Sequence, residues 1–257
     1  STSEMFGNTP PPQSEESAFD PVSPYGVSKR QAHEDYVVGY RARHGIFACS
    51  GFLFNHESPR RGPNFVTRKI TRGLAEIAAG VRPRLTLGNL DAKRDWGFAG
   101  DYVEAMWRML QLEEPRDFVI ASGETHTVRE FVEAAGRAAS IPVTFEGSGV
   151  NEVGRDSRGR IVVDVSPEFY RPVEVRLLQG DSAKAKEELS WEPTVGFDEL
   201  VAMMVRHDLA VDVFLAHPAG NELGDLRAEV DDQDLVVIGQ MAGIEGGRFL
   251  GGVHALN

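Results

Sequence analysis

Tyr25 and Lys29 are four residues apart at the expected start of a helix, a spacing that places both side chains on one helical face. A lysine ammonium close to a phenol favours the phenolate form of the tyrosine. Tyr25 is therefore a candidate general base, with Lys29 as the group that activates it. The same spacing occurs by chance on exposed helices, so the pair needs support from elsewhere in the chain.

Thr2 and Glu4 form a second candidate pair at the start of the chain. In an extended strand, residues i and i+2 share a face, so a strand over residues 1–5 would direct a hydroxyl and a carboxylate into one site. A carboxylate placed in this way can act as a base. Solvated Thr and Glu residues are also common at strand ends.

The elements that must position these residues can be predicted from local signals. Five prolines between residues 7 and 24 predict an irregular loop, and Pro24 suits the first turn of a helix that continues to about Arg43 and stops at Gly45. Thr127 and Glu130 have the spacing of a helix capping box. Alternating strands and helices predict an α/β fold with a mainly parallel sheet. The expected strands cover 46–54, 84–87, 118–121, 143–145 and 161–163, and further helices cover 65–79, 101–112, 181–189 and 197–208.

Composition excludes several classes of protein. Of the 257 residues, 41% are hydrophobic and 26% are charged, as in a packed globular domain. A net charge of −12 disfavours nucleic acids and anionic membranes as partners. No apolar run approaches the length of a membrane span, and the first residues lack a signal-peptide pattern. The single cysteine, Cys49, excludes an intramolecular disulfide framework and a cysteine-built zinc site, so we expect no metal and a cytoplasmic location.

Longer motifs add to the two candidate pairs. A Thr-x-Glu strand end, a proline-rich loop and a Tyr-x-x-x-Lys helix, in this order, are typical of extended short-chain dehydrogenase/reductases. Within that superfamily, the chain resembles the GDP-mannose 4,6-dehydratases from residue 1 to about residue 208. The matching motifs are NHESPRRG at 55–62, FVTRKI at 65–70, LGNLDAKRDWG at 87–97, DYVEAMW at 101–107, GETH at 123–126, VREFV at 128–132 and RPVEV at 171–175.

The resemblance implies a reaction and roles for the candidate residues. This family converts GDP-mannose to GDP-4-keto-6-deoxymannose with a tightly held NADP. By likeness to the family, Tyr25 takes the proton of the 4-hydroxyl group, while Lys29 holds the cofactor ribose and tunes the phenol. Glu4 removes the C5 proton, which the 4-keto group has made acidic. Thr2 orients the sugar and assists expulsion of the C6 hydroxyl group.

The resemblance also implies the binding residues and an oligomer. The cofactor would be held by Lys29, His56 and Arg61, and a guanidinium suits phosphate through its planar fork. A dimer or tetramer of identical subunits is expected for the full-length protein. Other interpretations remain open at this point: Arg60 and Arg61 as a solvated loop pair, Val66 as ordinary packing, and Lys93 with Asp95 as an exposed ion pair. The GDP-mannose would be contacted by Asn55, Val66, Lys69, Arg94, Arg171 and Glu174.

Two departures from the family pattern concern the fold and the site. The Gly-rich turn that cradles the dinucleotide pyrophosphate is absent from the 257 residues. We therefore expect an N-terminally truncated protein, with the C-terminal half of a Rossmann-like parallel sheet and a smaller, interleaved nucleotide-sugar-binding domain over residues 1–212. Residues 213–257 are expected to form a tail of unknown structure. In addition, residues 97–101 read GFAGD, where the family has Gly-His-Ala-Lys-Asp.

Two other functions remain open from the sequence. A different epimerase or dehydratase of the superfamily would share Tyr25 and Lys29, although an epimerase needs no base at C5 and so leaves Glu4 unexplained. Alternatively, the chain is a non-catalytic fragment that binds a nucleotide sugar, because the phosphate-binding turn is missing.

Overall fold

Short parallel strands hold the beginning of the chain in place. β1 (Gly51–Leu53) pairs in register with β6 (Phe118–Ile120), and Leu53 also forms a parallel bridge with Thr2. The structure is a computed structural model that describes residues 1–170 and 177–216. Thr2, β1 and β6 thus run side by side in one direction, as expected for the remaining strands of a parallel sheet.

Both faces of these strands are buried. Phe52 and Val119 pack on one face with Met5 and Phe6, which are fully buried. Phe118 and Ile120 pack on the other face, and the side chains that cover them are Tyr102, Met109, Ala185, Leu189 and Trp191. Burial on both faces explains why β1 and β6 are continuous apolar runs rather than alternating ones.

One long helix carries the Tyr-x-x-x-Lys motif. It consists of α1 (Pro24–Ala32), a π-helical segment (His33–Val38) and α2 (Gly39–His44). The hydroxyl oxygen of Ser23 accepts a hydrogen bond from the Gly26 amide at 3.0 Å and caps the first turn. The helix ends at Gly45, whose φ of +62° is the left-handed conformation that glycine adopts easily. The predicted helix, including its stop, is confirmed.

The other strands of the described residues form three further sheets, called here the second group. β2 (Asn55–Glu57) pairs in parallel with β5 (Trp96–Phe98). β4 (Lys93–Arg94) and β7 (His126–Thr127) form a short antiparallel pair. The remaining sheet has the order β3 (Leu85–Leu87), β10 (Ile161–Val165), β9 (Val153–Arg155) and β8 (Thr144–Glu146), in which only β3 and β10 are parallel.

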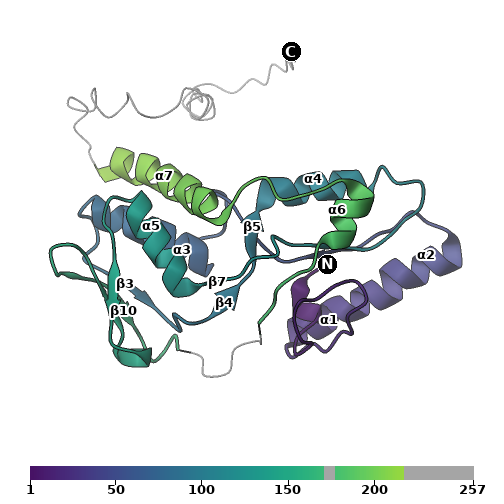
Figure 1. Ribbon diagram of the computed structural model, residues 1–257, viewed down its shortest axis with the longest axis horizontal. Helices are drawn as coiled ribbons and strands as arrows, with labels where there is room; N and C mark the ends of the chain where they lie inside the picture. Colours follow the sequence, from purple (N-terminus) through teal and green to yellow (C-terminus); the bar gives the residue numbers. More distant parts are fainter. Residues whose placement is uncertain (171–176, 217–257) are drawn as a thin grey trace, which may run out of the picture. The chain divides into compact units, whose positions relative to one another are not determined.

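Three helices pack together on this second group, as Figure 1 shows. They are α3 (Val66–Ala78), α5 (Val128–Ala138) and α7 (Phe197–Ala216), and their shared core contains Ile70, Leu74, Phe131, Leu200 and Met204. Two other helices, α4 (Ala99–Met109) and α6 (Ala183–Leu189), pack on the face of β6 that carries Phe118 and Ile120. Among the described helices, none has both the length and the apolar character needed to cross a lipid bilayer.

Some predicted boundaries are wrong. Residues 1–5 are not a strand, because Thr2 alone is extended and Ser3–Met5 form a 3-10 helix. The strand expected over 46–54 is confined to Gly51–Leu53. The helix expected to end at residue 208 continues to Ala216, beyond the expected start of the tail at 213. Residues 217–257 lie outside the described part of the chain.

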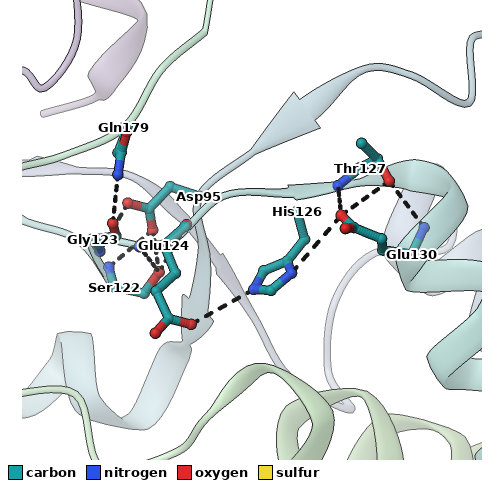
Figure 2. A network of polar contacts seen from close by, with 8 residues as sticks. All are labelled: Asp95, Ser122, Gly123, Glu124, His126, Thr127, Glu130 and Gln179. Carbon is teal, nitrogen blue, oxygen red and sulfur yellow. Dashed lines mark hydrogen bonds and ion pairs between the residues drawn. The ribbon is translucent and has the colours of Figure 1, made fainter.

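A buried carboxylate joins the two groups of strands. Asp95 lies between β4 and β5 and is fully buried. Its Oδ1 accepts hydrogen bonds from the Ser122 amide (2.9 Å) and hydroxyl (2.6 Å), and its Oδ2 from the amides of Gly123 (3.0 Å) and Gly180 (3.2 Å). Figure 2 shows this side chain facing the main chain that follows β6. The interpretation of Asp95 as half of an exposed ion pair with Lys93 is therefore wrong, because only Lys93 is exposed.

A second buried carboxylate seats α3 on β2. Glu57 is 1% exposed, and its Oε2 accepts a hydrogen bond of 2.6 Å from the Thr67 hydroxyl in the first turn of α3. The same oxygen lies 3.1 Å from Arg61 Nε. Burial raises the pKa of Glu57, although Thr67 and Arg61 act in the opposite direction. The chain between β2 and α3 is thus tied at both ends.

We predict that Asp95→Asn lowers the free energy of unfolding by about 1–3 kcal/mol, because an amide group would face backbone N–H donors that now have a carboxylate acceptor. Urea unfolding followed by circular dichroism measures the loss. The matched control is Asp198→Asn, at a carboxylate that is 80% exposed, which should change stability by less than about 0.5 kcal/mol. Equal effects of the two substitutions would contradict the role given to Asp95.

Glu57→Gln should change the pH dependence of stability. Because the pKa of Glu57 is raised in the folded protein, the native state binds this proton more tightly than the unfolded chain does. Its contribution to stability is therefore present below the ordinary value of 4.5 and is lost as pH rises through the folded pKa. The wild-type free energy of unfolding should fall relative to that of Glu57→Gln across this interval, as measured by urea unfolding at a series of pH values. A relative rise would mean that Arg61 and Thr67 outweigh burial.

Candidate active site

The structure brings the two N-terminal candidate pairs together. Gly26, next to Tyr25, is buried against the backbone of Glu4, and a Cβ atom at position 26 would lie 2.6 Å from the Glu4 carbonyl oxygen. Only glycine permits this approach. The first turn of α1 therefore lies directly on the segment that carries Glu4.

Thr2 and Glu4 are related by a cap rather than by a strand face. Thr2 is the N-cap of the 3-10 helix, and its Oγ1 accepts a hydrogen bond of 3.3 Å from the Glu4 amide. Both side chains are partly buried. The bridge from Thr2 to Leu53 places both residues at the carboxyl end of a parallel strand segment, where ligands bind in open α/β sheets.

Tyr25 and Lys29 share one face of α1, as their spacing predicts. The Nζ atom of Lys29 lies 5.8 Å from the centre of the Tyr25 ring, and both side chains are exposed. The ammonium of Lys29 thus lies on the same side of the helix as the Tyr25 ring. The pair is thus accessible to a ligand from solvent.

Asn55, His56 and Arg61 lie on β2 and the loop after it. Asn55 is the first residue of β2, and it lies two residues after Leu53, the residue of β1 that bridges to Thr2. The Nδ1–H group of His56 donates a hydrogen bond of 2.8 Å to the Phe54 carbonyl oxygen. The guanidinium of Arg61 lies 3.5 Å from the centre of the Phe65 ring.

Arg61 differs from its neighbour Arg60 in burial. Arg60 is exposed, whereas the side chain of Arg61 is only 20% exposed and lies between Glu57 and Phe65. The solvated loop pair considered from the sequence therefore describes Arg60 but not Arg61. The guanidinium of Arg61 is thus held between a carboxylate and an aromatic ring.

Val66 and Lys69 lie near the start of α3. Val66 is 37% exposed, and Lys69, one turn on, is half-buried with Nζ 4.4 Å from the centre of the Phe169 ring. Burial, assisted by the charge of Arg82, lowers the pKa of Lys69. Arg171 and Glu174, the other two residues expected to contact the substrate in this region, lie outside the described residues.

Arg94 lies on β4, where it is paired with His126 of β7. His126 stacks on Phe197 with ring centres 3.7 Å apart, and its two nitrogens lie 3.7 Å from Glu124 and 3.9 Å from Glu130. Figure 2 shows His126 between these two carboxylates. The next residue, Asp95, links the strand of Arg94 to the end of β6.

Phe98 and Gly100, which replace the family's His and Lys, fit one another. A Cβ atom at position 100 would lie 2.3 Å from the Phe98 ring. The glycine thus leaves space that the phenylalanine ring fills, so the two substitutions form a matched pair. The adjoining Gly97 is also close to a ring, since a Cβ there would lie 2.5 Å from Tyr102.

Several residues of this region are not predicted from the sequence. Gln13 and Asp95 are buried polar side chains with partners distant in the chain, whereas the buried Glu57 pairs with Thr67, only ten residues on. Asp95 follows Arg94 in the motif at 87–97, and this position beside a predicted binding residue is the one sequence feature that could have indicated its importance. In residues 1–170 and 177–216, no group of three or more His, Cys, Asp or Glu side chains is arranged to hold a metal ion.

A cavity of about 440 Å³ lies apart from the candidate site residues. It is bordered by the loop at Pro12 and by the segment that leads into α6. None of its lining residues is among the predicted catalytic or binding residues. The lining comprises Pro12, Gly123, Gln179, Gly180, Asp181, Ser182, Ala183, Lys186, Trp191, Glu192 and Pro193.

The solved structures that resemble this chain share its fold. RMD from Pseudomonas aeruginosa, solved with NADPH, superposes with a TM-score of 0.70 at 22% identity, over 82% of this chain and 65% of that one. The UDP-glucose 4-epimerase of Thermus thermophilus, solved with NAD, gives a TM-score of 0.61 at 24% identity, over 79% and 60%. These similarities confirm the Rossmann-like α/β fold class.

Sequence comparison is more specific. The chain is 56% identical over 208 residues to GDP-mannose 4,6 dehydratase 2 of Arabidopsis thaliana, covering 81% of this chain and 51% of that protein. It is 54% identical over 211 residues to the human GDP-mannose 4,6 dehydratase, covering 81% and 56%. The chain thus spans about half the length of the curated relatives that it matches. Since the profile of the family described as GDP-mannose 4,6 dehydratase also matches residues 1–204, the chain belongs to the GDP-mannose 4,6 dehydratase family.

Proposed function

We propose that this chain supplies the proton-transfer residues of an enzyme that converts GDP-mannose to GDP-4-keto-6-deoxymannose. The observation that supports the proposal is the contact of Gly26 with the Glu4 carbonyl, because the first turn of the Tyr-x-x-x-Lys helix then packs on the backbone of the residue that carries the carboxylate. A phenol and a carboxylate at one sugar ring provide the two bases that oxidation at C4 and elimination across C5–C6 require. The relatives named GDP-mannose 4,6 dehydratase support the choice of substrate.

Tyr25 takes the proton of the sugar 4-hydroxyl group as C4 is oxidised to a ketone. Lys29 stabilises the phenolate through its charge, 5.8 Å from the ring centre. When bound, a nicotinamide cofactor would supply the redox chemistry as acceptor of hydride from C4 and donor of hydride to C6, and Tyr25 would return its proton to C5.

Glu4 acts on the oxidised sugar. Once C4 is a ketone, the C5 proton is acidic enough for a carboxylate to remove, and the C6 hydroxyl group leaves as water. Thr2, whose hydroxyl is bonded to the Glu4 amide, orients the sugar and assists this departure. A simple epimerase has no use for a base at C5, so Glu4 favours the dehydratase.

The chain's cationic side chains suit an anionic cofactor and substrate in spite of the net charge of −12. We assign NADP to Lys29, His56 and Arg61, because a half-buried guanidinium over Phe65 fits a phosphate. Local positive charge of this kind attracts phosphate even where the overall field is repulsive. The GDP moiety is assigned to Asn55, Val66, Lys69 and Arg94, together with Arg171 and Glu174 outside the described residues.

The complete protein is proposed to be a cytoplasmic homodimer or homotetramer. The long helix carries exposed Tyr36, Val38 and Tyr40, residue types that contact partner subunits in many oligomers. The single thiol of Cys49 suits a reducing compartment.

The second candidate function is binding of the nucleotide sugar without turnover by these 257 residues alone. It is favoured by the absence of a Gly-rich phosphate-binding turn from the sequence. Calorimetric titration of the chain with NADP separates the two cases: submicromolar binding would contradict the non-catalytic fragment, and no binding at millimolar NADP would support it.

Tyr25→Phe, introduced into the full-length protein, should lower kcat for GDP-mannose by about 10²- to 10⁴-fold, because the proton acceptor for the 4-hydroxyl group is lost. Product formation is followed by mass spectrometry. Tyr36→Phe, on the same helix and 63% exposed, is the matched control and should keep the wild-type rate. Retention of turnover by Tyr25→Phe would remove Tyr25 from the mechanism.

Glu4→Gln should fail at a different step. Oxidation at C4 continues in this variant, whereas removal of the C5 proton does not, so a 4-keto sugar that still carries its C6 hydroxyl group should accumulate. Quenched reactions analysed by mass spectrometry distinguish this sugar from the dehydrated product. Formation of the dehydrated product at the wild-type rate would exclude Glu4 as the base.

A further inference from the structure

The proline-rich stretch after Glu4 is a closed loop whose two ends meet. Gly7 and Asp20 form a parallel bridge, the Asn8 amide donates to the Asp20 carbonyl oxygen at 3.0 Å, and the Asp20 amide donates to that of Phe6 at 3.3 Å. Gly7 has a φ of +54°, and a Cβ atom there would lie 1.9 Å from the Asp20 oxygen. Residues 8–19 therefore leave and return through one narrow neck, as in an Ω-loop.

The neck of this loop lies between the two proposed catalytic residues. Gly7 follows Glu4 by three residues, and Asp20 precedes Pro21. A Cβ atom on Gly26 would lie 3.0 Å from Pro21 Cβ and 2.6 Å from the Glu4 oxygen. The neck thus contacts both the segment of Glu4 and the first turn of the helix that carries Tyr25.

The tip of the loop is anchored through a buried amide. Gln13 is fully buried; its Oε1 accepts from the Gln179 amide at 2.9 Å, and its Nε2 donates to the carbonyls of Thr9 (2.9 Å) and Leu177 (3.3 Å). Its backbone amide donates to Gln179 O, and its carbonyl accepts from Asp181, both at 2.8 Å. Both Oε1 and Nε2 of Gln13 have hydrogen-bond partners. A shift of the loop by one residue would leave these buried polar atoms without partners.

Glu15 gives the tip a second anchor. Its carboxylate accepts a hydrogen bond of 2.6 Å from the Val119 amide, at the edge of β6 that faces away from β1. Glu15 is partly buried, and this burial raises the pKa of its carboxyl group. The loop therefore also covers an otherwise open strand edge.

The segment that receives Gln13 is the one that Asp95 holds. Gly180 donates its amide to Asp95, and the Gln179 side chain donates to the Gly123 carbonyl at 2.8 Å. Figure 2 shows the side chains of Gln179 and Asp95 both hydrogen-bonded to the short stretch after β6, at Gly123 and at Ser122 and Gly123. One continuous set of hydrogen bonds thus runs from Gln13 through Gly180 to Asp95, next to Arg94.

We propose that Gln13 is a positioning residue, which fixes Glu4 and Tyr25 relative to the Asp95 junction and its neighbour Arg94 through the loop 8–19. The proposal rests on the proposed function for the reaction that it affects. The buried side-chain amide of Gln13 bonds to Thr9, Leu177 and Gln179. Its amide sets the tip of the loop, and the closed neck transmits that position to the two bases. A displacement of about 1 Å at reacting groups is enough to lower turnover by about 10²-fold.

Gln13→Met tests this in the full-length protein, since methionine keeps the length of the side chain and loses its three hydrogen bonds. We expect kcat for GDP-mannose to fall by about 10- to 100-fold, with less than about a threefold change in KM, because Arg94 and Lys69 keep their places. Gln111→Met, at an exposed amide, is the matched control and should change neither constant. An increase in KM with kcat unchanged would overturn the proposal.

Hydrogen exchange on the 257-residue chain tests the coupling without turnover, so it separates failure of this inference from failure of the proposed function. Gln13→Met should speed exchange at the Gln179 and Asp181 amides and also at the neck amides of Asn8 and Asp20. Faster exchange at the tip with an unchanged neck would overturn the proposal. If Gln13→Met does not fold, Gln13→Glu, which keeps the acceptor for Gln179, must show the same pattern to a smaller degree.

Discussion

The carboxylate of Asp95 is the interaction on which the rest of the structure depends. A buried carboxylate is unfavourable unless its oxygens are hydrogen-bonded, and Asp95 takes donors from Ser122, Gly123 and Gly180. Those donors belong to two chain segments far from Asp95 in sequence. The strands around Arg94, the end of β6 and the stretch before α6 must therefore come together for the charge to be tolerated, and burial accordingly raises the pKa of Asp95.

The site near Glu4 depends instead on close approach of backbones. Gly26 lets the first turn of α1 touch Glu4, and Gly7 lets the loop neck close on Asp20. Arg41 and Asp117 then hold the far end of the same helix to β6 through an ion pair of 2.8 Å. A glycine contact at one end and an ion pair at the other fix the helix along its length, so the Tyr25 face keeps a constant relation to the parallel strands.

Local signals in the sequence predict the helices well. Ser23, Pro24 and Gly45 define the long helix, and Thr127 with Glu130 forms the predicted capping box, because caps and stops involve residues within a few positions of one another. The buried polar residues follow a different logic. Gln13 pairs with residues 164 to 166 positions away, and nothing within its own proline-rich stretch indicates such a partner. The shared strand face assumed for Thr2 and Glu4 was wrong for a related reason, since a side-chain cap won over extended geometry.

Burial around the candidate site disfavours both negative and positive side-chain charges, and this affects how a diphosphate would bind. Burial raises the pKa of Glu57 and lowers that of Lys69, so each group resists its charged form. A phosphate beside Lys69 would reverse this for the lysine, because an adjacent anion favours the ammonium. The neighbouring Glu57 contributes no competing anion to solvent, since Arg61 and Thr67 enclose it. Because Glu57 is enclosed, it adds little negative potential at the surface of a chain with a net charge of −12.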